Sequence, residues 1–206
     1  MQSIAPLSNP ASAQSSGWTA TAKDISLTHG HRVEIDEDAF FTSLLSDFET
    51  FVLPFHPAIP MSEVRNAIEI MSENPEARAF VYGLVAVTLN LTHSLRSRTS
   101  PESSDIATWV SRALEALGPV LMQENISIYR VATIQFMHVC FMGLGRYDIA
   151  FYYLRQSITM VEILRIEDSS SMAMLPLTER SQRQRLYWTV YVSHTCSART
   201  VEPGSC

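Results

Sequence analysis

The chain has 206 residues, of which 46% are hydrophobic, and its formal net charge is −6. This length and this hydrophobic fraction favour one folded domain over a wholly disordered chain. The excess of acidic over basic side chains argues against the broad positive surface that nonspecific binding to phosphates requires. A nucleic-acid-binding face is therefore not expected.

The cysteines exclude a binuclear zinc cluster within these residues. The three cysteines, Cys140, Cys196 and Cys206, are far apart, and none belongs to a C-x-x-C pair. A six-cysteine cluster needs such pairs, because thiolates that bridge two zinc ions come from a compact loop. Widely spaced cysteines also fit a reducing compartment better than a secreted protein. We expect no metal and no cofactor.

The first 30 residues are rich in Ser, Ala, Thr and Pro and contain few large aliphatic side chains. Such a composition cannot offset the entropy lost on ordering. The sequence predicts a disordered tail over residues 1–38, a folded domain over 39–199 and a flexible C-terminus over 200–206. The start of the chain lacks the features of a secretory signal, and no apolar run reaches the roughly 18 residues of a spanning helix. We expect a soluble intracellular protein without membrane contact.

Apolar residues recur at steps of three and four along most of the folded part, which predicts amphipathic helices. Pro54 and Pro57 end the first helix and Pro75 opens the third, because proline lacks a backbone donor and restricts its predecessor. Ser104 or Asp105 caps the fourth helix. The predicted helices cover residues 39–52, 61–72, 75–98, 106–122, 128–142 and 146–165, with a polar loop over 97–104, a linker over 167–176 and a last helix capped by Thr178.

Two of these helices form the centre of the predicted fold. The helix over 128–142, capped by Ser127, carries apolar residues on nearly every side, which indicates burial all round. Gly143 and Gly145 end it, and the short link to the helix over 146–165 predicts an antiparallel hairpin. The expected fold class is all-α, an irregular multi-helix bundle around this central hairpin. In the second helix the predicted core stripe is Tyr147, Ala150, Leu154, Ile158, Val161 and Leu164, and the predicted polar stripe is Asp148, Tyr152, Arg155, Thr159 and Glu162.

Four short segments match a known family. They are FHPAIP at 55–60, Ile134-Gln135-Phe136 ahead of the two glycines, AFYYLRQSITM at 150–160 followed by Glu167-Asp168-Ser169, and Glu179 ahead of Arg183, Arg185, Leu186, Tyr187 and Trp188. In this order, over about residues 40–198, they resemble the middle regulatory domain of fungal zinc-cluster transcription factors. Within that family they are most similar to the maltose- and amylase-activator type.

The resemblance implies a nuclear regulator of transcription that controls a metabolic or biosynthetic gene set. The zinc cluster and the dimerising coiled coil of the family are missing here. Action is therefore expected through a full-length transcription factor or another regulatory protein, without autonomous DNA binding. The family domain continues where this chain stops, so we also expect a truncated domain with an uncovered apolar face. Three alternatives stay open: a helical interaction module or decoy that sequesters a full-length relative, a small-molecule-binding or enzymatic helical protein, which is least favoured, and a nonfunctional gene remnant.

Arg180, Arg183 and Arg185 form a basic cluster on the last helix and are the candidate contacts for a partner or an acidic ligand. The favoured alternative is a solvated face in which Glu179 pairs with Arg183 at i, i+4. The neighbouring aromatic residues continue a helical stripe, which predicts that they belong to the core. These aromatic residues are Tyr187, Trp188 and Tyr191.

The histidines are expected to be structural. His138 and Cys140 are two residues apart on one helix, so their side chains point about 200° apart and cannot meet. His56 belongs to the proline-rich loop, where a hydrogen bond that stabilises the turn is expected. His29 and His31 lack a third metal ligand. The chain contains no G-x-S-x-G, H-E-x-x-H or Gly-rich phosphate motif, so no enzyme is expected.

Overall fold

The computed structural model describes residues 37–94, 100–119 and 126–200, with the side chains of 40–92, 103–119 and 126–196. The described residues belong to one compact unit. The predicted tail over 1–38, with His29 and His31, lies outside the described residues except for its last two, which are helical. Of the predicted flexible C-terminus, only Thr200 is described, as the last residue of a helix.

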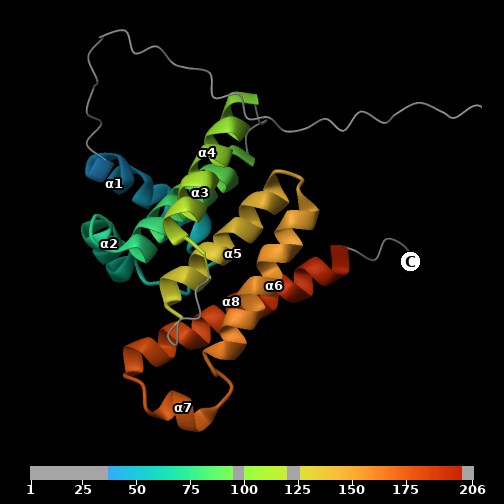
Figure 1. Ribbon diagram of the computed structural model, residues 1–206. Coiled ribbons are helices and arrows are strands. Elements are labelled where there is room, and N and C mark those ends of the chain that lie inside the picture. Colours follow the sequence, from blue (N-terminus) through green and yellow to red (C-terminus); the bar gives the residue numbers. More distant parts are fainter. Residues whose placement is uncertain (1–36, 95–99, 120–125, 201–206) are drawn as a thin grey trace, which may run out of the picture. The chain divides into compact units, whose positions relative to one another are not determined.

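The described part of the chain is built from helices, and it contains no strand (Figure 1). The predicted all-α fold class is therefore confirmed. In chain order the elements are α1 (Glu37–Asp47), the π-helix η1 (Phe48–Val52), α2 (Met61–Ile70), α3 (Pro75–Ser94), α4 (Ser100–Leu117), α5 (Ile128–Gly143), α6 (Tyr147–Ile163), α7 (Ser169–Ala173) and α8 (Leu177–Thr200). Among the described helices, none is both long enough and apolar enough to cross a membrane.

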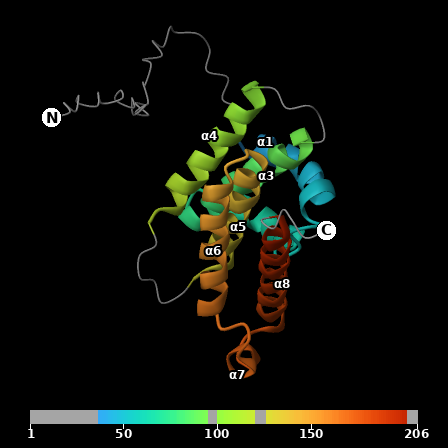
Figure 2. The same ribbon diagram turned by 90° about the vertical axis from the view of Figure 1, so that its right-hand side faces the viewer.

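Helix α5 is the centre of the bundle. Ten of its 16 residues are buried, and it packs against α3, α4, α6 and α8. Figures 1 and 2 both show α5 in the middle of the bundle, between α4 and α8. Contact on several sides explains why apolar residues occupy nearly the whole circumference of this helix.

The first turn of α5 is held by a polar cluster. Ser127 accepts a hydrogen bond from the backbone N of Arg130 at 3.1 Å, so the predicted cap is confirmed. The hydroxyl of Ser127 also donates to the carboxylate of Glu76 in the first turn of α3. Arg130 pairs with the same carboxylate through Nε at 2.6 Å and donates from Nη2 to the carbonyl of Leu117 at 2.7 Å. One buried guanidinium thus joins α5 to the start of α3 and the end of α4.

The predicted antiparallel hairpin is present as α5 and α6, which pack along their length. A ring nitrogen of His138, Nδ1, lies 3.0 Å from the carbonyl oxygen of Ala150, and the rings of Phe141 and Tyr153 stack at 5.5 Å. Most of the predicted core stripe of α6 is buried, whereas Ile158 is half-buried and Tyr147 is exposed at the first turn. All five members of the predicted polar stripe are exposed.

Two helices end at a glycine in the left-handed region. Gly145 has a φ of 72° two residues after the end of α5, where the sequence predicts a glycine stop. Gly118 has a φ of 63° and ends α4 at Leu117. The predicted extension of this helix to residue 122 is therefore wrong, because a left-handed glycine breaks the helical hydrogen-bond ladder.

The start of α4 also differs from the prediction. Residues 97–104 were expected to form a polar loop, but α4 begins at Ser100. Pro101 suits a first helical turn, because its missing N–H would have no partner there. The predicted caps, Ser104 and Asp105, lie inside the helix.

The predicted linker over 167–176 contains the short helix α7. Asp168 caps it by accepting a hydrogen bond from the backbone N of Ser170 at 3.0 Å. Hydrogen bonds from Ser170 and Ser171 lower the pKa of Asp168 to about 2. Thr178 lies inside α8, which begins at Leu177, so its predicted role as a cap is wrong.

Candidate partner-binding surface on α7 and α8

The first of the three candidate arginines, Arg180, is used within the domain. Its Nε donates to the carbonyl of Met172 at 3.0 Å, and its Nη2 donates to the carbonyls of Ala173 at 3.0 Å and Leu175 at 3.3 Å. The last carbonyls of a helix lack backbone partners and carry partial negative charge. Arg180 therefore caps the C-terminal end of α7 and fixes it against α8.

Arg183 has a similar role at the end of α6. Its Nη2 and Nε donate to Oε1 of Glu179 at 2.7 and 3.1 Å, and its Nη1 donates to the carbonyl of Leu164 at 3.1 Å. The expected i, i+4 pair with Glu179 is therefore present, and the same guanidinium joins α8 to the C-terminal turn of α6.

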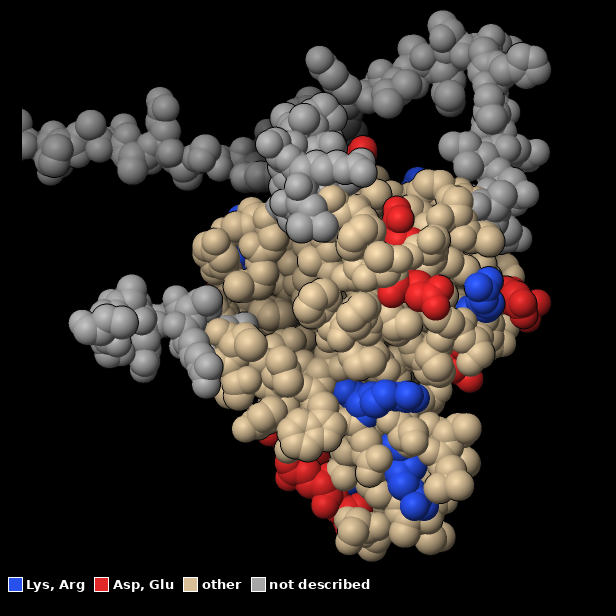
Figure 3. All heavy atoms as spheres, turned by 180° about the vertical axis from the view of Figure 1, so that it is seen from behind, with Lys and Arg blue, Asp and Glu red and all other residues tan. Residues whose placement is uncertain are grey.

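Arg185 differs from the other two. Its side chain is exposed. Its backbone carbonyl accepts a hydrogen bond from Thr189, but its guanidinium has no hydrogen bond or ion pair with the described residues. A step of two residues turns a helix by about 200°, which takes Arg185 away from Arg183. Figure 3 shows basic side chains on the part of the surface formed by α7 and the start of α8. The structure thus uses Arg180 and Arg183 in separate internal contacts and leaves the side chain of Arg185 available to another molecule.

The aromatic residues of α8 form a cluster on the outside of the helix. The ring centroids of Tyr187, Trp188 and Tyr191 lie 5.6, 5.8 and 6.3 Å apart. Trp188 is 60% exposed, Tyr191 is 49% exposed and the adjoining Val192 is 53% exposed. The prediction that these rings belong to the core is therefore wrong for Trp188 and Tyr191. We call these four residues, Tyr187, Trp188, Tyr191 and Val192, the aromatic face of α8.

Trp188 and Tyr191 are exposed because the rest of the domain covers only the opposite side of α8. Leu186, Thr189 and Val190 are buried, and they share one side of the helix at steps of three and four residues. Trp188, Tyr191 and Val192 occupy the other side. Because both sides are apolar, hydrophobic periodicity alone could not show which side faces the domain. A sequence signal for the outer side was the cation at Arg185, three residues before Trp188, but the sequence did not distinguish it from Arg180 and Arg183.

The inner side of α8 is anchored by polar contacts as well as apolar packing. Gln135 of α5 donates from Nε2 to the hydroxyl of Ser193 at 2.6 Å, and its Oε1 accepts from the hydroxyl of Ser157 of α6 at 3.0 Å. The buried amide therefore links three helices. Tyr187 adds a bond from its hydroxyl to Oε1 of Glu167 at 3.0 Å, and this bond raises the pKa of Tyr187. The aromatic face is thus presented on a helix that is fixed in position.

The described residues contain no group of three or more His, Cys, Asp or Glu side chains placed to hold a metal ion. Cys140 is buried and Cys196 is exposed. His138 and Cys140 sit on one helix as expected, with His138 bonded to the carbonyl of Ala150. The surface of α7 and α8 offers aromatic rings, a free guanidinium and a fixed backbone, which are the elements of a protein contact.

Comparison with known proteins shows similarity at low sequence identity. No family model matches the chain, and no solved structure matches it. The chain is 22% identical over 152 residues to a Candida albicans protein described as probable sucrose utilization protein SUC1. The match covers 72% of this chain and 30% of that protein, so the chain spans less than a third of its relative's length. The chain is therefore similar, over most of its own length, to a fungal protein named for sucrose utilization.

Proposed function

We propose that this domain is a nuclear regulator of transcription that controls a metabolic gene set through contact with another regulatory protein. Its similarity to a fungal protein named for sucrose utilization supports sugar metabolism as the area of control. The four segments that resemble fungal transcription-factor regulatory domains support the same role. No catalytic activity is part of the proposal.

The observation that carries the proposal is the aromatic face of α8. Trp, Tyr and Arg are the residues most enriched among those that dominate binding energy at protein interfaces. Here two exposed rings, Trp188 and Tyr191, lie beside the exposed Arg185 on a helix anchored by Gln135. Fixed rings lose little conformational entropy on binding, so they favour contact with a partner of complementary shape.

The charge of the chain supports a protein partner over DNA. Specific DNA binding needs several Lys or Arg contacts to phosphates. The chain carries an excess of acidic groups, and two of the three clustered arginines, Arg180 and Arg183, already bond carbonyls of the domain. A full-length transcription factor is the partner that we propose.

The experiment is to replace Trp188 and Tyr191 by alanine and to follow both partner binding and transcripts. We expect binding to a purified full-length relative to weaken at least about tenfold, because each ring would lie at the centre of the contact. The same transcripts should change as in a deletion strain. Tyr147→Ala is the matched control, because Tyr147 is aromatic and exposed but lies on α6, outside the surface of α7 and α8. Unchanged binding and transcripts in the double variant would contradict the proposal.

The second candidate function is a decoy that sequesters a full-length relative, and the same exposed face favours it. The sign of the transcript change separates the two functions. Deletion of a decoy raises the output of the relative, whereas deletion of a cooperating regulator lowers it. Purification of the tagged chain should recover the relative in either case.

A further inference from the structure

An open groove adjoins the start of α8, and none of its lining residues belongs to the aromatic face. It lies where the start of α5, the end of α6, α7 and the start of α8 meet, and Figure 1 shows these ends gathered in the lower part of the molecule. Two adjoining parts, with free spaces of about 590 and 320 Å³, share Ile126, Ser127, Glu179 and Arg183 in their linings. Each part has the size of a small-molecule site.

Arg165 follows α6 in an unusual backbone conformation. Its φ is 49°, and among the described residues it is the only one other than glycine with a positive φ. Glycine is the usual residue at this place after a helix, because a Cβ crowds the backbone in the left-handed region. Arginine is therefore held here with some strain, and strain of this kind is concentrated at functional sites.

The side chain of Arg165 is not used within the described part of the domain. It is exposed and lines the larger part of the groove, and its guanidinium has no hydrogen bond or ion pair with the described residues. A second guanidinium lies at the same end, because Nη1 of Arg183 is 3.1 Å from the carbonyl oxygen of Leu164, the residue before Arg165. Arg183 uses three of its five N–H groups in the described bonds to Leu164 and Glu179, so two remain for a ligand.

The charged side chains differ between the two parts of the groove. Arg165, Arg183 and Glu179 line the larger part, which gives it one net positive charge. Glu63, Glu179 and Arg183 line the smaller part, which gives it one net negative charge. Guanidinium groups bind carboxylates and phosphates through paired hydrogen bonds. A single net positive charge at the α6–α7 end matches a carboxylate better than a doubly charged phosphate.

Apolar side chains form the rest of the wall at this end. They are Ile126, Ile163, Leu164 and Leu175. Ile163 is 55% exposed, so a ligand with an apolar body would remove part of this surface from water and gain free energy from its burial. The lining therefore suits an organic acid better than an inorganic anion.

We propose that this groove binds a small organic acid with one carboxylate and an apolar body. Arg165 is the main contact of the carboxylate, Arg183 is the second, and the apolar wall contacts the body of the ligand. The site goes beyond the proposed function. It stands if binding of a partner at the aromatic face fails, because the two surfaces share no residue.

The first test uses the unaltered chain and three probes, namely hexanoate, hexanol and inorganic phosphate. Titration followed by nuclear magnetic resonance should give saturable shifts with hexanoate at the methyl groups of Ile163 and Leu175. Hexanol, which lacks the charge, and phosphate, which lacks the apolar chain, should each bind at least about tenfold more weakly. No saturable shift at the groove with hexanoate, or equal or tighter binding of either other probe, would overturn the proposal.

The second test compares Arg165→Gln with Arg155→Gln. Both variants change the net charge equally, and Arg155 is the matched control because it is exposed on α6 and does not line the groove. The Kd of hexanoate should rise at least about tenfold in Arg165→Gln and less than about twofold in Arg155→Gln. Equal losses in the two variants would mean that hexanoate responds to net charge alone, which contradicts a site at Arg165.

Arg165→Gly separates binding from folding. Glycine adopts the left-handed conformation without strain, so the Tm of this variant should rise or stay within about 2 °C of the original value. Hexanoate binding should weaken as in Arg165→Gln. A lower Tm with unchanged hexanoate binding would assign Arg165 to the fold and would rule out the proposed site.

Discussion

Two buried histidines, His56 and His138, have pKa values that the fold lowers. Burial, and then the positive charge that His138 can carry, lower the pKa of His56 to about 4. Burial also lowers the pKa of His138, although its hydrogen bond to Ala150 opposes this shift. Both histidines are therefore harder to protonate in the folded chain than in the unfolded chain.

The first prediction concerns acid stability. Between about pH 6.5 and pH 4 the unfolded chain binds a proton at His56 and the folded chain does not, so acidification favours unfolding. The free energy of unfolding should fall by about 3 kcal/mol from His56 across this window, because each pKa unit is equivalent to about 1.4 kcal/mol. Urea denaturation at a series of pH values measures this slope. His56→Leu should flatten the slope, and an equally steep slope in that variant would contradict the assignment.

The second prediction concerns the buried ion pair. The side chain of Arg130 is 6% exposed, and its Nε lies 2.6 Å from Oε1 of Glu76. Removal of one partner leaves the other charge buried without compensation. Glu76→Ala should therefore lower the free energy of unfolding by about 3–5 kcal/mol, measured by urea denaturation. Asp148→Ala is the control, because the pair of Asp148 with Arg146 is long, at 3.8 Å, and exposed, so its loss should cost less than about 0.5 kcal/mol.

Helix ends and helix crossings explain the roles of two glycines. Gly145 lies in the left-handed region after α5, with open space where a Cβ would be. Gly83 lies inside α3, and a Cβ there would sit 3.4 Å from Phe136 and 3.5 Å from Met137 of α5. Gly145 is therefore needed for its left-handed backbone conformation. Gly83 lies where α3 packs closely against α5 but where a methyl group would make ordinary contacts.

The third prediction follows from this difference. Gly145→Ala should lower the free energy of unfolding by about 1–2 kcal/mol, because only the left-handed backbone opposes the added methyl group. Gly83→Ala should leave stability unchanged or raise it by up to about 1 kcal/mol, because alanine favours the helix and its Cβ makes ordinary contacts. Thermal unfolding of the two variants measures both effects. A larger loss for Gly83→Ala than for Gly145→Ala would show that the α3–α5 contact cannot accept a methyl group.

The net charge of the molecule and the internal contacts of its arginines disfavour binding to DNA. The net charge is −6, and internal hydrogen bonds already use Arg130, Arg180 and Arg183. The fourth prediction is that this chain binds no duplex with nanomolar affinity at physiological salt, as measured by gel shift. Raising the salt concentration should abolish any residual binding, because it would be nonspecific. Nanomolar binding to a defined site would show that the domain reads DNA without a partner.

Much of the fold is encoded in local sequence signals. Ser127 predicts the start of α5, Gly145 predicts its end, and the apolar circumference of α5 predicts its central place. These features depend on backbone hydrogen bonds and turn conformations within a few residues, so neighbouring amino acids are enough to specify them. The α5–α6 hairpin can also be predicted from the sequence. A link of only a few residues holds the two helices close together, and helices of this length are stabilised mainly by packing.

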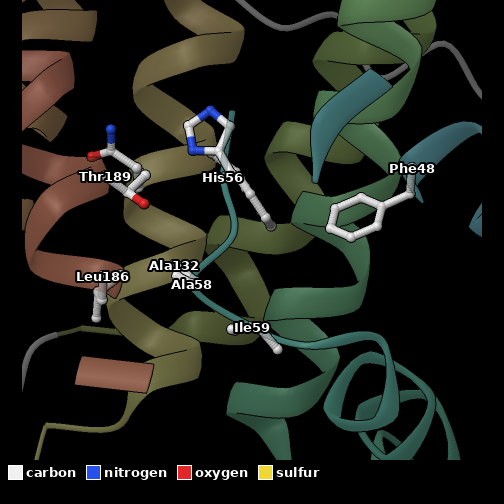
Figure 4. A pocket seen from close by; sticks show the side chains of 9 residues that line it. Phe48, His56, Ala58, Ile59, Ala132, Leu186 and Thr189 are labelled. Atoms are coloured by element: carbon white, nitrogen blue, oxygen red, sulfur yellow. The ribbon is translucent and has the colours of Figure 1, made fainter. Parts of the chain in front are cut away.

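Long-range packing specifies the rest. Trp188 and Tyr191 belong to an α8 that is apolar on two sides, and only the positions of α5 and α6 show that Leu186 and Val190 face inward. The burial of His56 likewise results from the meeting of the proline-rich loop, α5 and α8 (Figure 4). Burial depends on which distant segments of the chain pack over a side chain. The neighbouring residues in the sequence do not show which segments these are. The sequence therefore specifies the helices and their central pair, whereas the packed structure specifies the exposed aromatic face and the burial of His56.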